Sequence, residues 1–367
     1  MDKALLDLYS DYLLSSFSLS TATGLAALVD NAVSHDQITR FLGQPRYEQK
    51  DYWQVIKPVV RQVEQEAGLI IVDDTIEEKP YTDESELVCY HYDHSQGRSV
   101  KGINLLNFVY HVTTPQGEVS IPVAYEVVTK PDVYQDPQTG KYKRRSEVSK
   151  NELTRQRLKI LSQSNQVRFK YVVNDIWFSS KENMNWIKTE LHKEFVMALK
   201  ENRLVALSAQ DKAQGRFVAL ADLDLKPGQC RLVYLKGVEF PVIVAKQVFT
   251  NQDGSTGTLY LVSSDTTLTY DQLTTIYHKR WHVEVFHKSL KQNAALEKSP
   301  TKTIRAQCNH IFGSMVAVTK LECLALIRQT NHFALKSKLY LKALQAAFAQ
   351  LRALNCQSLD SVKFSFA

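Results

Sequence analysis

The sequence has few cysteines, and they lie far apart. The five are spread over 367 residues without a C-x-x-C motif: Cys89, Cys230, Cys308, Cys323 and Cys356. Zinc clusters and the disulfide frameworks of small secreted proteins both need close or regular spacing. The spacing therefore indicates a reducing compartment, and we expect a cytoplasmic protein.

Several other sequence signals are missing. Residues 1–11 hold three acids and lack the charged-then-apolar order of a signal peptide. The apolar stretch 313–327 contains Lys320 and Glu322, and we expect it to be too short to cross a bilayer. The chain has no G-x-x-x-x-G-K loop for nucleotide phosphates and no H-x-x-R pattern of the tyrosine recombinases. These absences argue against a membrane partner, an ATP-driven motor and that class of recombinase.

The composition is ordinary for a globular protein, but the charge is unevenly distributed. Hydrophobic residues make up 44% of the chain and the net charge is +6, in a length sufficient for two or three domains. Residues 141–170 include ten Lys or Arg against two Glu, whereas residues 73–86 include seven acids against one Lys. Cations near carboxylates suit an enzyme that binds the DNA backbone and metal ions. We expect Lys143, Arg144 and Arg145 to contact DNA, with a solvated loop as the simpler alternative.

The most informative motif has the form Y-x2-R-x3-E-x6-K. It consists of Tyr277, Arg280, Glu284 and Lys291, which fall within an arc of roughly 60° if they share one helix. A carboxylate between two cations and a phenol suits a metal-dependent reaction on a phosphodiester, because the carboxylate binds the metal and the cations bind phosphate oxygens. The alternative is an ordinary surface ion pair between Arg280 and Glu284.

Two upstream aspartates are candidate partners for this glutamate. Residues 68–75 read as a buried strand that ends in Asp73 and Asp74, and residues 169–180 place Asp175 after a second apolar run. Two Asp on adjacent strands and one Glu on a covering helix suffice to bind two Mg²⁺ ions roughly 3.5–4 Å apart. Either Asp alone would more simply be a turn or N-cap residue.

Asp73, Asp175 and Glu284 together resemble the catalytic triad of a DDE transposase of the insertion-sequence-four type. The resemblance extends from about residue 69 to residue 320 and is most specific in the Y-R-E-K motif. It implies a mixed α/β fold with a ribonuclease-H-like core, a β-rich insertion before the Glu helix, and cut-and-paste movement of DNA. Asp73 is preferred to Asp74 because the family pattern places its catalytic Asp two residues before a Thr, here Thr75.

The resemblance also implies ligands and partners. The triad would bind two Mg²⁺ ions, with Mn²⁺ as a substitute, and Tyr277, Arg280 and Lys291 would hold the transposon end. The partners would be the inverted repeats, target DNA and a second copy of the chain, in a bacterial, nucleoid-associated setting. Family members that form a DNA hairpin use an aromatic wedge from the insertion. No Trp occurs between residues 202 and 270, so Phe240 and Phe249 are the candidate replacements.

The sequence predicts helices in the first part of the chain and a sheet with covering helices in the middle. Residues 5–14, 21–29 and 34–42 have helical patterns, with Ser34 as N-cap. The last two resemble a helix-turn-helix in which Gln37 and Arg40 would contact DNA, although a plain helical hairpin fits equally well. The core is then expected from strands at 69–75, 103–112, 119–127, 168–173 and 195–199 and helices at 149–161 and 181–192.

We divide the chain into five segments. They are a helical DNA-binding domain, the first part of the catalytic core, a β-rich insertion, the second part of the core, and a C-terminal helical segment: 1–65, 66–202, 203–267, 268–330 and 331–367. The insertion is expected to contain strands near 217–220, 230–235, 240–248 and 258–262. The amphipathic pattern at 335–354 favours a helix that covers the core or forms a dimer over one that contacts DNA.

Two functional alternatives remain open. One is a ribonuclease-H-like nuclease without strand transfer, and the other is a domesticated DNA-binding protein with a decayed site. The second is weakened because all three carboxylates and the whole Y-R-E-K motif are present. His278 and His282 have the i,i+4 spacing of zinc ligands, but no H-E-x-x-H motif accompanies them. Packing or phosphate contact is therefore the favoured interpretation of these two residues.

Overall fold

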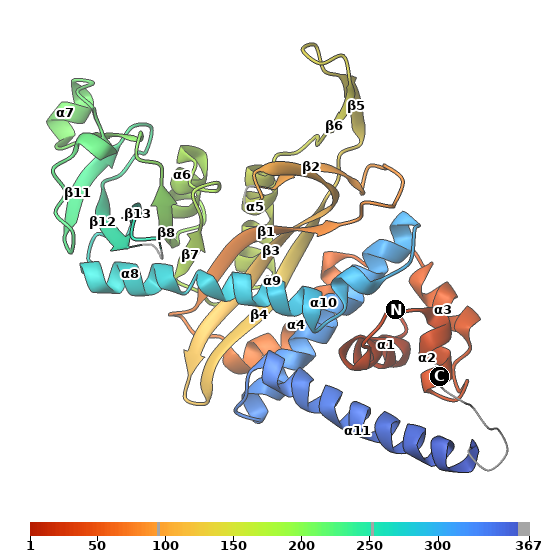
Figure 1. The fold of residues 1–367 in the computed structure, drawn as a ribbon. Coiled ribbons are helices and arrows are strands. Elements are labelled where there is room, and N and C mark those ends of the chain that lie inside the picture. The colour runs from red at the N-terminus through yellow and green to blue at the C-terminus, as the bar shows by residue number, and fades with distance from the viewer. Residues whose placement is uncertain (94–95, 251–252, 359–367) are drawn as a thin grey trace.

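A large mixed sheet flanked by helices organises the protein (Figure 1). The structure, a computed structural model, describes residues 1–93, 96–250 and 253–358. The strand order is β10-β9-β11-β12-β13-β8-β7-β1-β3-β2, and β4 pairs with β3. This arrangement confirms the expected mixed α/β fold of ribonuclease-H type.

The centre of the sheet is built from long apolar strands. In β1 (Leu69–Glu78) the run Leu69 to Val72 is fully buried, as a continuous apolar strand should be. The strand pairs antiparallel with β3 (Arg98–Thr114), which pairs antiparallel with β4 (Gly117–Val128). On its other side β1 pairs parallel with β7 (Tyr171–Asn174), and β7 pairs parallel with β8 (Glu194–Leu199).

Helices cover both faces of this sheet. Figure 1 shows α8 (Tyr270–His278), α9 (Trp281–Gln292) and α10 (Ile304–Ile327) crossing one face. The opposite face bears α5 (Lys150–Lys159), which is capped by Ser149 and continues as a π-helical turn over Ile160–Ser164. The helix α6 (Lys181–Thr189) begins at its cap Ser180. Both caps accept a bond from the third residue of their helix, which explains where these helices start.

The N-terminal helices pack around α10. They are α1 (Lys3–Ser15), α2 (Ala22–Leu28), α3 (His35–Leu42) and α4 (Gln49–Val63). Tyr9 lies within hydrogen-bonding distance of His310, at 2.8 Å, and Gly313 leaves room for the ring of Tyr9. The predicted cap at Ser34 is present as a capping box with Gln37. Helix α4 was not anticipated individually, and it contains Pro58, a residue that argues against a helix.

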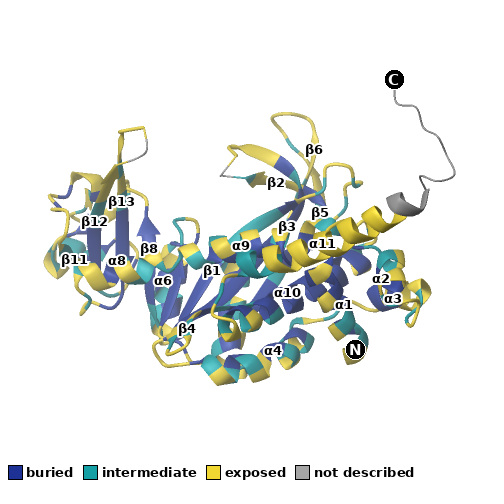
Figure 2. Ribbon diagram, turned by 60° about the horizontal axis from the view of Figure 1, so that its bottom comes forward, coloured by how far each residue is buried: buried dark blue, intermediate teal, exposed yellow. Residues whose placement is uncertain are grey.

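We expected the apolar stretch 313–327 to be too short to cross a bilayer, and this expectation is wrong. The helix α10 runs continuously for 24 residues from Ile304, which is long and apolar enough to cross a membrane. However, 67% of its most apolar window is buried inside the protein. Figure 2 shows α10 largely dark blue between the sheet and the N-terminal helices. Such burial is typical of a core helix.

The expected β-rich insertion continues the core sheet. Strand β13 (Thr256–Ser263) pairs antiparallel with β8, and β12 (Val242–Thr250) and β11 (Cys230–Leu235) follow it outwards. Two short strands, β9 (Leu204–Ala206) and β10 (Val218–Ala219), complete that edge, next to α7 (Ala209–Ala213). The ranges expected from the sequence overlap β10, β11, β12 and β13, whereas β9 was not anticipated.

Three local features differ from the expectations. Strand β1 does not end in Asp73 and Asp74, because its pairing with β3 continues as far as Glu78. Strand β2 (Cys89–Asp93) was not anticipated. The basic residues Lys143, Arg144 and Arg145 do not lie in a loop: β6 (Tyr142–Arg145) pairs with β5 (Asp132–Gln135) in a separate two-stranded sheet. This hairpin projects from the main body in Figure 1.

The C-terminal helix α11 (His332–Ser358) is mostly exposed, and it is yellow along much of its length in Figure 2. Its exposed large apolar side chains recur along the helix: Leu339, Tyr340, Leu341, Leu344, Phe348, Leu351 and Leu354. The helix therefore does not cover the core along this stretch, which removes one of the two preferred interpretations of residues 335–354.

Candidate active site

The first two candidate carboxylates lie on neighbouring strands. Val72 of β1 pairs with Asn174 of β7 in a parallel register, so Asp73 and Asp175 are the next residues on each strand path. Asp73 is also opposite Asn107 of β3. Because β7 ends at Asn174 while β1 continues, Asp175 begins a loop, where its carboxylate accepts a bond of 2.9 Å from the Trp177 amide.

Asp73 and Asp74 face opposite sides of the sheet, as the alternation of a strand requires. Asp73 contacts Arg280, just ahead of α9, at 3.4 Å. Asp74 instead binds Lys150 of α5 through both carboxylate oxygens, at 2.9 and 3.0 Å, and accepts a 2.6 Å bond from Asn104. Only Asp73 therefore points to the side from which Glu284 approaches.

The Y-R-E-K residues do not lie on one uninterrupted helix, so the single-helix expectation is wrong. Tyr277 belongs to the last turn of α8, and Arg280 immediately precedes α9. At the junction the amides of four residues bond to carbonyls only three residues earlier: Lys279, Arg280, His282 and Val283. Such bonds are those of a tight 3₁₀ turn. Because the turn is compact, Tyr277 and Arg280 still lie side by side, with the guanidinium 5.9 Å from the ring centre.

Arg280 joins the motif to the first aspartate. It donates a 2.6 Å bond to Glu284 and lies 3.4 Å from Asp73. The i,i+4 pair of the alternative interpretation therefore exists, but it is part of a larger cluster and not an isolated surface contact. The Arg280 side chain is only 20% exposed. Burial opposes its charge, but Tyr277, Glu284 and Asp73 outweigh this and raise the pKa of the guanidinium.

Lys291 of α9 contacts β1 three residues beyond Asp73. Its ammonium donates a 2.7 Å bond to the carbonyl of Ile76 and is 3.2 Å from Glu297. These contacts tie α9 to β1. The lysine therefore has a structural partner of its own, beside any contact with phosphate.

The negative charges of Asp73, Asp175 and Glu284 favour the binding of a cation. Burial, then the nearby charges of Asp175 and Asp74, raises the pKa of Asp73 to about 7. Burial also raises the pKa of Asp175. Among the described residues, the oxygens of Asp73, Asp175 and Glu284 do not all lie within 4.8 Å of one another, and Arg280 contacts both Asp73 and Glu284. A divalent ion would replace the unfavourable repulsion between the aspartates with attraction, so the donor set fits hard cations such as Mg²⁺.

Sequence reasoning missed two polar residues beside these carboxylates. Asn107 is fully buried, its amide lies 3.0 Å from His287 of α9, and its Oδ1 has no hydrogen-bond partner. Burial lowers the pKa of His287 to about 3, so this imidazole is neutral. The available signal was the presence of Asn104 and Asn107 within the otherwise mostly apolar run of 103–112. Each such residue requires a buried partner.

The predicted DNA contacts lie elsewhere on the protein. Arg40 is exposed on α3 and, with Arg46 and Lys50, borders a shallow hollow of about 800 Å³. The three basic residues of β6 are all paired: Lys143 with Asp136, Arg144 with Glu84 at 3.3 Å, and Arg145 with Asp132 at 3.4 Å. The structure does not bring either group into the carboxylate cluster.

The two candidate wedge residues differ in their surroundings. Phe240 packs on the core near Phe195, with ring centres 6.2 Å apart. Phe249 is 45% exposed and borders a small cavity of about 240 Å³ with Tyr277 and Trp281. Only Phe249 is therefore free to meet a ligand beside the Y-R-E-K motif.

Comparison with known families agrees with this geometry. The family model described as DDE superfamily endonuclease matches residues 2–216, which is more than half of the chain. The model described as Transposase DDE domain matches residues 143–319. The search of curated proteins found no match. Asp73 and Asp175 fall in the first matched range, and Asp175 and Glu284 fall in the second. The chain belongs to the DDE superfamily of endonucleases, as a transposase-type enzyme that acts on DNA.

Proposed function

We propose that this protein is the transposase of a bacterial insertion sequence of the insertion-sequence-four type. It cuts the ends of its element and joins them to target DNA. The observation that carries this proposal is the contact of Arg280 with both Glu284 and Asp73, beside Asp175. It connects the Y-R-E-K motif to the two aspartates of the sheet.

Each residue of the cluster has a role in this proposal. Asp73, Asp175 and Glu284 are the metal ligands, and endonucleases of this superfamily use divalent ions. Two Mg²⁺ ions, or Mn²⁺ in their place, would polarise the phosphate and stabilise the attacking and leaving oxygens. Arg280 provides the positive charge beside a bound phosphate, and Tyr277 supports the guanidinium through its ring.

The remaining basic residues guide the DNA. Arg40 on α3 belongs to the proposed end-recognition region, residues 1–65. Lys143, Arg144 and Arg145 lie on β6 of the β5–β6 hairpin, which projects from the main body (Figure 1) and would contact DNA outside the cluster. Because these three cations already have carboxylate partners, DNA has to compete with Asp136, Glu84 and Asp132 for them.

The working form is proposed to be a homodimer on DNA, in the cytoplasm and associated with the nucleoid. The described residues of one chain hold one cluster of Asp73, Asp175 and Glu284, so coordinated cutting at two ends requires two chains. The exposed apolar side chains of α11 are the candidate contact between them. Mass measurement with and without end DNA tests this. A one-chain complex that completes strand transfer would contradict the dimer.

Strand transfer separates this function from its closest rival, a nuclease that only cuts. The test supplies a DNA fragment with the element's end, a supercoiled target and Mg²⁺, and analyses the products on a gel. We expect joined products that depend on the end sequence. If the protein cuts the ends but never joins them to the target, the nuclease is the better description. If it binds without cutting, the domesticated DNA-binding protein is.

A further inference from the structure

Three potential metal ligands from the β3–β4 hairpin and from α9 lie close together. They are His111 of β3, Glu118 of β4 and His282 of α9, and their ligand atoms all lie within 4.8 Å of one another. The Nε2 atom of His282 is 3.2 Å from Glu118, and that of His111 is 3.9 Å from it. His282 precedes Glu284 by two residues, which places it roughly 200° around the helix from the carboxylate cluster.

The environment of His111 favours its use as a metal ligand. The residue is fully buried, and its Nδ1 atom is 3.0 Å from the Ser120 hydroxyl. A partner at Nδ1 fixes the ring and directs Nε2 towards Glu118, which is the arrangement that metal-binding histidines commonly have. Burial, with His282 and Lys279, lowers the pKa of His111 to about 3, so the imidazole is neutral. The two imidazoles stack with ring centres 4.1 Å apart, and their ligand nitrogens lie within 4.8 Å of each other.

A positively charged side chain, Lys279, already lies beside these three residues. The ammonium of Lys279 is 3.4 Å from both His111 and Glu118 and 2.9 Å from the Thr113 hydroxyl. The lysine side chain is 24% exposed, and its ammonium ends a four-carbon stem with several rotatable bonds. It can therefore leave the cluster when another cation enters.

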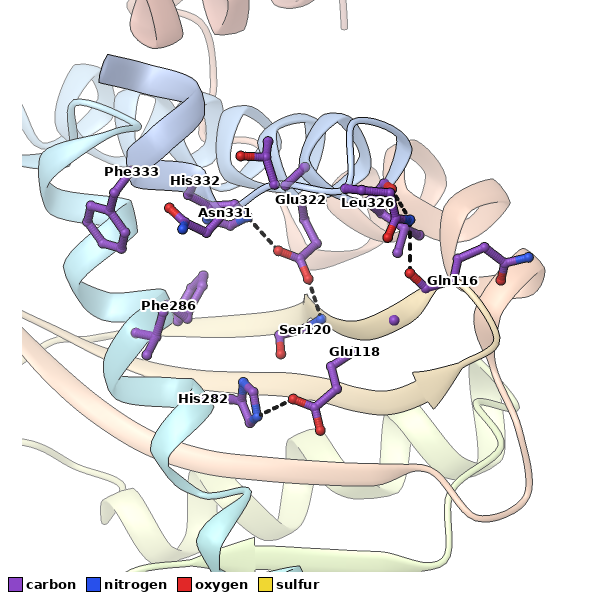
Figure 3. A pocket seen from close by; sticks show the side chains of 15 residues that line it. Gln116, Glu118, Ser120, His282, Phe286, Glu322, Leu326, Asn331, His332 and Phe333 are labelled. Atoms are coloured by element: carbon purple, nitrogen blue, oxygen red, sulfur yellow. Dashed lines mark hydrogen bonds and ion pairs between the residues drawn. The ribbon is translucent and has the colours of Figure 1, made fainter. Parts of the chain in front are cut away.

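The cluster is open to solvent through a cavity. Glu118 and His282 line a space of about 550 Å³ between α9, the β3–β4 hairpin and the junction of α10 with α11 (Figure 3). Across this space Glu322 pairs with His332 at 2.5 Å and accepts a bond from the Ser120 amide. An ion can thus reach the three side chains, and a water molecule can complete its coordination.

We propose that His111, Glu118 and His282 bind a transition-metal ion of the Zn²⁺ type, which displaces the ammonium of Lys279. Two imidazole nitrogens and one carboxylate are ligands that Zn²⁺ prefers, whereas Mg²⁺ prefers oxygen ligands alone. The ion would tie α9, which carries Glu284, to the β3–β4 hairpin. It would therefore stabilise the helix without taking part in the reaction at the carboxylates.

The test measures Zn²⁺ binding to the full chain after removal of metal with EDTA. Zn²⁺ is added at micromolar concentration with millimolar Mg²⁺ present, bound zinc is counted after dialysis, and the melting temperature is recorded. We expect one Zn²⁺ per chain and a rise of roughly 3 °C at saturation. Glu118→Gln should lower the affinity at least tenfold and abolish the rise. Glu118 is 48% exposed, so this change leaves the fold intact.

Further variants separate this site from its neighbours. Asp73→Asn should retain the zinc, because the ion is not held by the catalytic carboxylates. His278→Asn, on an exposed histidine outside the cluster, should also retain it. Lys279→Met should bind Zn²⁺ more tightly than the wild type, since it removes the competing ammonium. His111→Gln should behave as Glu118→Gln does.

The outcomes decide the proposal in both directions. Loss of zinc in the Glu118 and His111 variants, with retention in Asp73→Asn, supports it. Zinc that is lost only in Asp73→Asn belongs to the carboxylate cluster and overturns it. So does the absence of binding in both the wild type and Lys279→Met. None of these results depends on DNA cleavage, so the proposed function stands or falls separately.

Discussion

Lys150 binds both carboxylate oxygens of Asp74, at 2.9 and 3.0 Å. The contact occupies Asp74 on the α5 side of the sheet and leaves Asp73, its neighbour in sequence, on the α9 side. A choice that the sequence supported only by family pattern thus has a physical basis. Two adjacent aspartates on one strand cannot serve the same site, because their side chains alternate.

Asp74→Asn should preserve DNA cleavage and cost only a little stability. The substitution removes an ion pair whose lysine is 42% exposed, so we expect a loss of about 1 kcal/mol in the free energy of unfolding. Urea denaturation and an end-cleavage assay measure the two effects. Loss of cleavage in a folded Asp74→Asn protein would show that Asp73 is the wrong choice of aspartate.

Asp73→Asn should stabilise the metal-free protein above pH 7. The pKa of Asp73 is raised from 3.8 to about 7, so between these values the folded state keeps a proton that the unfolded chain has lost. Stability therefore falls as the pH rises through this window, and the neutral Asn escapes the penalty. We expect a gain on the order of 2 kcal/mol at pH 8 in EDTA.

The comparison uses denaturation of the wild type and variant at pH 5 and pH 8 in EDTA. The difference should shrink towards pH 5, and Mg²⁺ should stabilise the wild type more than the variant at pH 8. The exposed Asp83 provides a control, since Asp83→Asn should show no comparable gain. Equal stability of wild type and Asp73→Asn at both pH values would argue against a strained carboxylate.

Arg280→Ala and Lys291→Ala should both weaken DNA binding by removing phosphate contacts. Each lost contact should flatten the dependence of log affinity on log salt by roughly one unit. Lys291 also bonds to the Ile76 carbonyl, so its variant should lose stability as well. Lys288→Ala is the control, because Lys288 is exposed on the same helix beside Phe333. An unchanged slope for Lys291→Ala would leave it only the structural contact.

The β5–β6 hairpin should bind DNA in competition with its own carboxylates. Replacing Lys143, Arg144 and Arg145 together by Ala should flatten the salt dependence by up to roughly three units. Replacing Asp132 and Asp136 by Asn should have the opposite effect, because it releases Arg145 and Lys143. Binding curves at several salt concentrations test both. If neither variant changes the slope, the hairpin lies away from the DNA.

The sequence predicted the centre of the sheet and the neighbouring positions of Asp73 and Asp175 well. Continuous apolar runs are typical of buried strands. Two such runs form the parallel pair β1–β7, in which Val72 lies opposite Asn174. The helix break near Arg280 was not predictable in this way, since no Gly or Pro lies at the junction. It results from the tertiary placement of α8 and α9.

Contacts between side chains that are distant in sequence could not be predicted either, because they too depend on tertiary packing. Nothing in the local pattern joins Lys150 to Asp74 or His111 to His282, because these pairs depend on how strands and helices pack. The hairpin of β5 and β6 was missed because its strands are short and exposed, without the apolar alternation that marks a strand.

The most direct test of the whole account is Mg²⁺-dependent cleavage of end-containing DNA by Asp73→Asn, Asp175→Asn and Glu284→Gln proteins. We expect each single change to lower the cleavage rate by at least about a hundredfold, since losing one ligand disrupts the two-metal arrangement. Each variant should still bind the DNA. Wild-type cleavage by any one of the three folded variants would contradict the account.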